Sequence, residues 1–141
     1  MISPVLVPMD GSEMSEHALE YALEAYPDAE ITVLTVVGEP SPMWGEATGL
    51  SLADDLEEAA QEHARAVFDR ARDIVDDADG DADLETVVEL GHPVRAIVER
   101  ADDYDTVVVG SHGGSVADRL YVGNVAETVV HRSPVPVVVV R

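Results

Sequence analysis

The stretch that decides the fold runs from residue 106 to 129 and reads TVVVGSHGGSVADRLYVGNVAETV. An uncharged β-branched run leads into Gly110, with Gly113 three residues later and Gly123 ten residues after that. Such a run is typical of a strand that is buried on both faces of a parallel sheet. Because glycine allows positive φ and close approach of the backbone, the pattern predicts a strand followed by a loop with exposed N–H groups.

The rest of the chain alternates between strand and helix in the same way. Short apolar runs predict strands at residues 2–9, 31–37, 84–90, 105–109 and 134–140. Apolar residues at helical spacing predict helices at 12–26, 52–75, 94–101 and 123–131. With right-handed crossovers, this order predicts a doubly wound α/β domain over residues 1–141 with a five-stranded parallel sheet. Ligands of such sheets bind beyond the carboxyl ends of the strands, where the strand order reverses.

The composition is strongly acidic. Asp and Glu number 29 against 8 basic residues, all of them arginine, for a net charge of −21. This charge argues against binding to nucleic acid or to an anionic membrane. We expect a salt-adapted source, since molar salt reduces the screening length to about 3 Å and relieves self-repulsion.

Several classes of function and location are disfavoured by what the sequence lacks. The chain has no cysteine, which excludes disulfides and thiol chemistry. Its first residues lack a basic region and a long apolar run, so they do not resemble a signal peptide. No apolar stretch approaches the roughly 20 residues that span a bilayer. We therefore expect a cytoplasmic protein.

The glycine segment has the properties of an anion site. Successive N–H groups after Gly110 can form a nest for an anion, and the helix that opens at Gly123 and Asn124 favours negative charge at its N-terminus. Two such elements thirteen residues apart could hold a polyphosphate between them. The segment lacks the GK[ST] ending of a Walker A loop and does not follow the G-x-G-x-x-G pattern.

These motifs together resemble those of the universal stress protein family. The spacing G-x2-G-x9-G is present, together with PMDGSE near the start, ELGHP before the third helix and SPVPVVVVR at the end. The resemblance covers the whole chain and points to the ATP-binding branch, in a halophilic archaeon. It implies a Rossmann-like fold, similar to the adenine nucleotide alpha hydrolases, with strand order 3-2-1-4-5. One departure is Asn124, which stands where that branch has Ser or Thr.

The resemblance also implies roles for individual residues. It assigns the ribose and adenine side of an ATP site to Pro8, Asp10 and Val36, the last through its backbone. The phosphates would be held by two groups, Gly110, Ser111, His112, Gly113 and Gly114 on one side and Gly123, Asn124 and Val125 on the other. The family usually dimerises through its last strand, here from Val135 to Val140. From the residues alone, Asp10 could equally cap a turn and His112 could be a solvated loop residue.

ATP in so acidic a protein requires a counter-charge. We expect Mg²⁺ or Mn²⁺ to neutralise the phosphates, with Asp10 approaching the ion through water. The leading hypothesis is a dimeric, ATP-binding stress or regulatory factor, and the alternative is a protein-interaction module of the same fold that binds no nucleotide. An adenylate-forming enzyme is disfavoured, because MDGSEMS lacks the S-G-G-x-D-S loop of the related pyrophosphatases. With no general base apparent, we expect at most slow hydrolysis through a metal-bound water.

Overall fold

The fold is a parallel sheet between two layers of helices, in a computed structural model that describes residues 2–37, 51–78, 83–111 and 124–141. The side chains of its long helix are described from residue 58 onward. The strands lie in the order β3-β2-β1-β4-β5, and every pairing between neighbours is parallel. Their bounds are β1 Val5–Pro8, β2 Ile31–Val37, β3 Leu84–Leu90, β4 Thr106–Gly110 and β5 Val137–Val140. The predicted fold class and strand order are confirmed.

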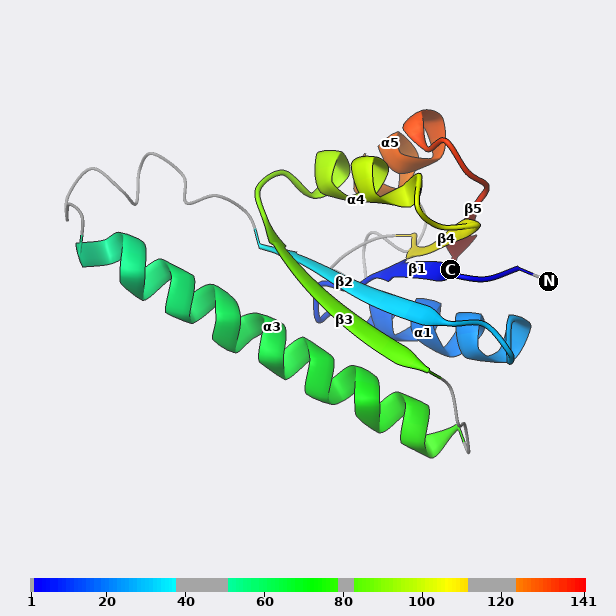
Figure 1. Cartoon of the computed structure of the whole chain (residues 1–141), viewed down its shortest axis with the longest axis horizontal. Coiled ribbons are helices and arrows are strands. Elements are labelled where there is room, and N and C mark those ends of the chain that lie inside the picture. The colour runs from blue at the N-terminus through cyan, green and yellow to red at the C-terminus, as the bar shows by residue number, and fades with distance from the viewer. Residues whose placement is uncertain (1, 38–50, 79–82, 112–123) are drawn as a thin grey trace.

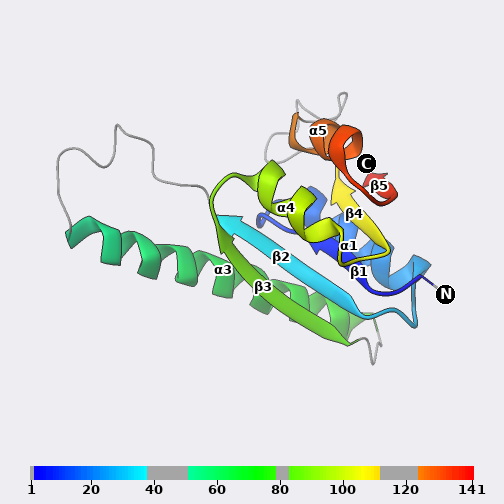
Figure 2. The ribbon, with the colours of Figure 1, turned by 45° about the horizontal axis from the view of Figure 1, so that its top comes forward.

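Helices of the described part of the chain cover both faces of the sheet, as Figures 1 and 2 show. On one face lie α1 (Glu13–Ala25) and α3 (Ser51–Asp77), and on the other α4 (Pro93–Ala101) and α5 (Asn124–Arg132). Each helix buries the apolar stripe that the sequence predicts. In α3 this stripe includes Ala64, Val67, Ala71 and Ile74, which pack on the sheet together with Ala18 and Leu19 of α1. Ile97 of α4 and Val129 of α5 pack on the opposite face.

The predicted boundaries of the first and the last strand differ from the observed ones. The last strand begins at Val137 and not at residue 134, because Pro134 and Pro136 have no N–H to donate to a neighbouring strand. The hydroxyl of Ser133 bonds both the N–H and the C=O of Val135, which fixes a turn there. The first strand is limited to Val5–Pro8 and not 2–9. The other elements agree with the predictions to within two residues.

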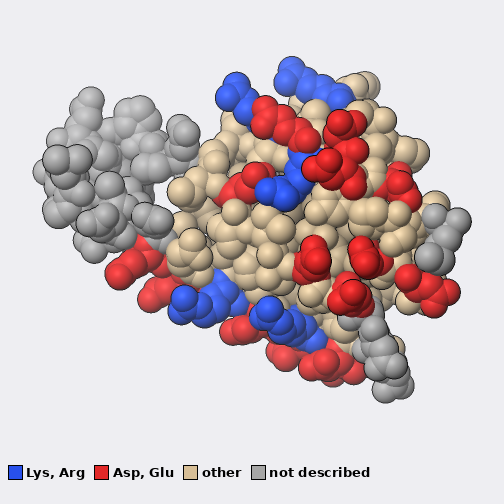
Figure 3. All heavy atoms as spheres, in the orientation of Figure 1, with Lys and Arg blue, Asp and Glu red and all other residues tan. Residues whose placement is uncertain are grey.

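On the face that Figure 3 shows, Asp and Glu side chains are spread over the surface with a few arginines among them. One ion pair joins the two helices of the same layer: the Arg70 Nε of α3 lies 2.7 Å from the Glu16 Oε1 of α1. The hydrogen bond to this carboxylate raises the pKa of Arg70 above its ordinary value. Among the described helices, none has the length and apolar character needed to cross a membrane.

Candidate functional site

The strand order reverses between β1 and β4, so a crevice is expected at their carboxyl ends. Pro8, the last residue of β1, explains why the two strands separate there. Val5 and Met9 donate their N–H groups to the β2 side, so the alternation of a parallel strand directs the backbone of Pro8 toward β4. Proline has no N–H to extend that ladder, and the β1–β4 register ends at Leu6 and Val107. Pro8 therefore ends the pairing at the switch point.

The backbone of Val36 faces the space that β1 vacates. The Leu34 carbonyl accepts the Met9 N–H on the β1 side at 2.9 Å, while the Val37 carbonyl accepts the Gly91 N–H on the β3 side at 3.0 Å. Alternation then directs the N–H and C=O of Val36 toward β1, beyond its last residue. No described residue continues the backbone pairing past Met9 on that side. Val36 thus presents one donor and one acceptor, a pair that matches the donor and acceptor on the edge of an adenine ring.

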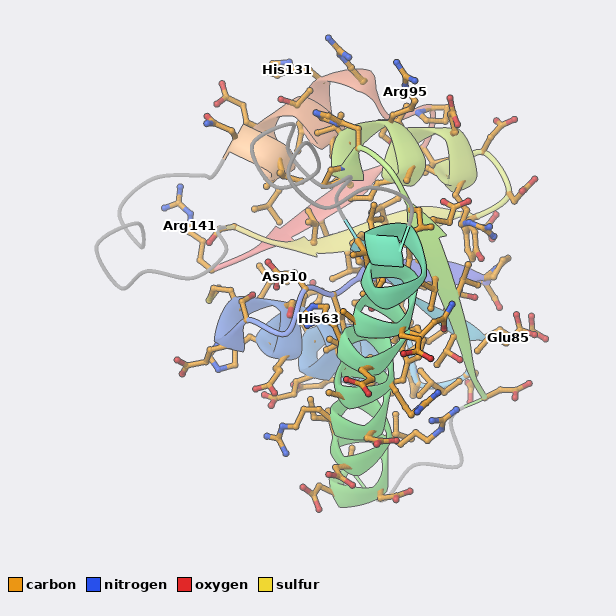
Figure 4. All side chains as sticks on the ribbon, turned by 90° about the vertical axis from the view of Figure 1, so that its left-hand side faces the viewer. Asp10, His63, Glu85, Arg95, His131 and Arg141 are labelled. Atoms are coloured by element: carbon orange, nitrogen blue, oxygen red, sulfur yellow. The ribbon has the colours of Figure 1, made fainter. Side chains whose placement is uncertain are left out.

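Asp10 has the structural role that the sequence left open. Its Oδ1 accepts the Ser12 N–H at 2.9 Å, which closes a turn at the start of α1. Ser12 in turn caps the helix by accepting the Ser15 N–H at 3.2 Å. Asp10 is exposed, and Figure 4 shows it at the carboxyl end of the sheet. Its turn role does not exclude a ligand role, because only one oxygen is engaged by the turn.

A histidine of α3 borders the same turn. Gly11 has φ of +86°, and the His63 Cε1 lies 3.8 Å from the position that a Cβ of Gly11 would take. Figure 4, which looks at the carboxyl end of the sheet, shows Asp10 and His63 next to each other. The sequence analysis missed His63 because nothing in its helical spacing reveals which turn of the chain α3 meets.

Gly110 is required by packing against α1. A Cβ at this position would stand 2.9 Å from the Met14 carbonyl oxygen and 3.0 Å from its carbon, closer than real contacts allow. Directly after Gly110, the Ser111 N–H donates to the Val140 carbonyl of β5 at 2.7 Å, and Ser111 is buried. The packing of β4 against α1 therefore explains the glycine at position 110, which the sequence analysis placed in an anion site.

The second half of the predicted phosphate site is described only in part. Asn124 is the first residue of α5, and both it and Val125 are exposed. The Asn124 carbonyl accepts the Thr128 hydroxyl at 2.7 Å, within the first turn. The remaining predicted residues, His112, Gly113, Gly114 and Gly123, lie outside the described residues. Of the predicted site residues that the structure describes, five lie at the carboxyl end of the sheet: Pro8, Asp10, Val36, Gly110 and Ser111.

A separate cavity of about 550 Å³ lies where β3 leads into α4, lined by residues 89–93 and by Arg95, Ala96 and Glu99. None of the predicted site residues lines it. Glu89 on its wall bonds Arg100 at 3.1 Å, and this hydrogen bond raises the pKa of Arg100 above its ordinary value. Gly91 has φ of +131° and lies in the turn after β3, and Pro93 opens α4.

The geometry of the described residues fits an adenine nucleotide. The backbone of Val36 offers the donor and acceptor that adenine requires, and the start of α5 offers N–H groups to an anion. Within the described part of the chain, no three His, Asp or Glu side chains are grouped so as to hold a metal ion.

The fold is that of a doubly wound α/β protein, a class whose ligands bind at the switch point of the sheet. The chain belongs to the universal stress protein family, whose family model matches residues 1–141.

Relatives of known sequence support this membership. A universal stress protein of Methanocaldococcus jannaschii is 31% identical over 146 residues, covering 97% of this chain and 81% of the relative. The universal stress protein YxiE of Bacillus subtilis is 27% identical, with 100% of both chains covered. Other relatives are longer: the chain spans 45% of a Mycobacterium tuberculosis universal stress protein that is 29% identical to it.

Solved structures agree with the fold. Universal stress protein UspA from Lactobacillus plantarum superimposes with a TM-score of 0.83 at 26% identity, covering 99% of this chain and 97% of that one. A universal stress protein in complex with cAMP superimposes with a TM-score of 0.65 at 30% identity, with the same coverage.

Proposed function

We propose that this protein binds ATP, or a closely related adenine nucleotide, in the crevice at the carboxyl ends of β1, β2 and β4. The observation that carries the proposal is the free backbone edge of Val36, which faces the end of β1. The relative of 30% identity that holds cAMP supports an adenine nucleotide as the ligand class. ATP is proposed over a cyclic monophosphate because the glycine segment and the start of α5 provide two places for phosphate groups.

The proposed contacts follow the family resemblance, supported by the positions of the described site residues at the carboxyl end of the sheet. The ribose and adenine lie against Pro8, Asp10 and Val36. The phosphates lie between Gly110 to Gly114 and the group formed by Gly123, Asn124 and Val125. Mg²⁺ or Mn²⁺ neutralises them, and the exposed oxygen of Asp10 reaches the ion through water.

We propose that the protein acts as a homodimer through the edge formed by residues Val135 to Val140. The two edge strands of the sheet differ in charge. β3 carries Glu85 and Glu89, which oppose pairing with another strand, whereas β5 consists of four half-buried valines. An apolar edge without charged residues is suited to pairing with a second copy. We propose that this dimer is a stress or regulatory factor in a salt-rich cytoplasm.

The alternative function is a protein-interaction module that binds no nucleotide. The observation that favours it is Asn124, which replaces the Ser or Thr of the ATP-binding branch at the start of α5. The complete set of three glycines favours nucleotide binding.

Calorimetric titration of ATP in molar KCl separates the two functions. We expect the wild-type protein to bind ATP and Gly113→Val to lose this binding. The urea midpoint of the variant should equal that of the wild type. No heat of binding in the wild-type protein would contradict ATP binding and favour the interaction module. Native mass spectrometry of freshly purified protein measures co-purified nucleotide and the dimer in one experiment.

A further inference from the structure

The proposed ligand is an anion, yet few cations lie near its site. Among the described arginines, three are paired with carboxylates, namely Arg70, Arg72 and Arg100. No described carboxylate pairs with Arg65, Arg95, Arg132 or Arg141, of which the first three belong to helices. Arg132 is the last residue of α5, at the end opposite to the N-terminus that faces the crevice.

Arg141 is the described arginine that follows the carboxyl end of a strand. The preceding carbonyl, that of Val140, accepts the Ser111 N–H at 2.7 Å, and Val140 is in register with Gly110. Arg141 therefore stands opposite Ser111, about 5 Å away across a pair of parallel strands. Its backbone position is fixed by the sheet and does not depend on the loop that follows Ser111.

The side chain of Arg141 is accessible among the described residues. It is exposed, and no described carboxylate pairs with it. Figure 4 shows Arg141 and Asp10 at the same end of the sheet, with the start of α5 on that side as well. In a chain with a net charge of −21 and no lysine, an arginine in this place that pairs with none of the described carboxylates calls for an explanation.

We propose that Arg141 is a specificity-determining residue that binds the phosphate groups of the nucleotide from the β5 side. The inference rests on the proposed function and adds to it the preference for charged nucleotides over the uncharged nucleoside. Guanidinium groups bind phosphate oxygens through paired N–H donors and carry a positive charge. Arg141 would therefore favour a nucleotide over the nucleoside more strongly than main-chain N–H donors alone.

The test compares Arg141→Gln with Arg72→Gln, which removes the same charge from an exposed position on α3 with only a 3.9 Å contact to Asp69. Affinities for ATP and for adenosine are measured by calorimetry at one salt concentration. Arg141→Gln is expected to weaken ATP binding about tenfold, the effect of one charge-assisted contact, and to leave adenosine binding unchanged. Arg72→Gln should change neither affinity, and Arg141→Lys should retain part of the ATP affinity.

The outcomes separate this inference from the proposed function. Equal ATP affinity in the two glutamine variants overturns the role of Arg141 and leaves nucleotide binding intact. A parallel loss of ATP and adenosine binding in Arg141→Gln also overturns it, because it indicates a structural effect. A wild-type protein that binds neither ligand overturns the proposed function, and the role of Arg141 with it.

Discussion

Gly110 lies so close to the first turn of α1 that a Cβ on it would stand 2.9 Å from the Met14 carbonyl oxygen. The contact is with main chain, which cannot move aside without displacing the helix. It joins the end of β4 to the helix that follows the Asp10 turn, so two segments that border the proposed site meet at this contact. The bare backbone at Gly110 is thus a condition for the close packing of β4 against α1.

Gly110→Ala is therefore expected to destabilise the protein in the absence of any nucleotide. Overpacking against a helix backbone costs about 1–3 kcal/mol of unfolding free energy. Gly91→Ala is a useful comparison, because its Cβ meets no atom within 4 Å and its cost arises only from its φ of +131°. Urea unfolding of both variants measures the effect. A wild-type midpoint in Gly110→Ala would contradict the close packing with Met14.

The pattern of apolar residues was sufficient to predict the doubly wound parallel sheet, and the family resemblance supplied its strand order. Burial requires apolar residues on the faces that meet the core, and the spacing of these residues along the chain indicates helix or strand. Ile31–Val37 and the apolar stripe of α3 are examples. The resemblance then assigned Asp10 and Val36 to a site. The sequence analysis did not reveal the contact of Gly110 with Met14 or of His63 with Gly11, because both depend on how closely two separate elements approach.

Asp10→Asn separates the turn role of Asp10 from its ligand role. An asparagine Oδ1 can still accept the Ser12 N–H, so we expect the urea midpoint to stay near that of the wild type. The charge that would face a hydrated cation is lost, so the Mg²⁺ dependence of ATP affinity should fall. Asp10→Ala should lose the turn as well and about 1 kcal/mol of stability. An unchanged Mg²⁺ dependence in Asp10→Asn would remove Asp10 from the proposed metal site.

The half-buried pair of Glu89 and Arg100 is expected to contribute to stability. Its 3.1 Å hydrogen bond raises the pKa of Arg100, so the contribution of the arginine charge is fully present at neutral pH and is lost as pH rises through that raised pKa. Glu89→Gln should cost about 1 kcal/mol of unfolding free energy after allowance for partial solvent screening. Asp69→Asn is the control, since Asp69 lies 3.9 Å from Arg72 in an exposed pair. Equal urea midpoints in the two variants would mean that the Glu89 pair contributes nothing measurable.

Asn124→Ser restores the residue type of the ATP-binding branch at the start of α5. Serine and asparagine both suit a helix N-terminus, so the stability of the protein should change little. A serine hydroxyl can donate to phosphate at the same place, and ATP affinity should therefore be preserved or increase. Calorimetry of the two proteins side by side measures this. A weaker affinity in Asn124→Ser would show that Asn124 makes a contact of its own, and the inferred equivalence of the two residues would be wrong.

The net charge of −21 predicts that stability rises with salt. Carboxylates crowd the exposed surface of α3 and neighbouring elements, and their repulsion is screened as the Debye length falls from about 10 Å at 0.1 M to about 3 Å at 1 M. The urea midpoint should thus increase with KCl and level off near molar concentration, where screening is nearly complete. Sucrose, which stabilises by exclusion from the surface without screening charge, is the control. A midpoint that is independent of KCl would contradict salt adaptation. An equal rise of the urea midpoint in sucrose would show that the effect comes from exclusion of the solute from the protein surface. Of the two solutes, KCl alone screens charge.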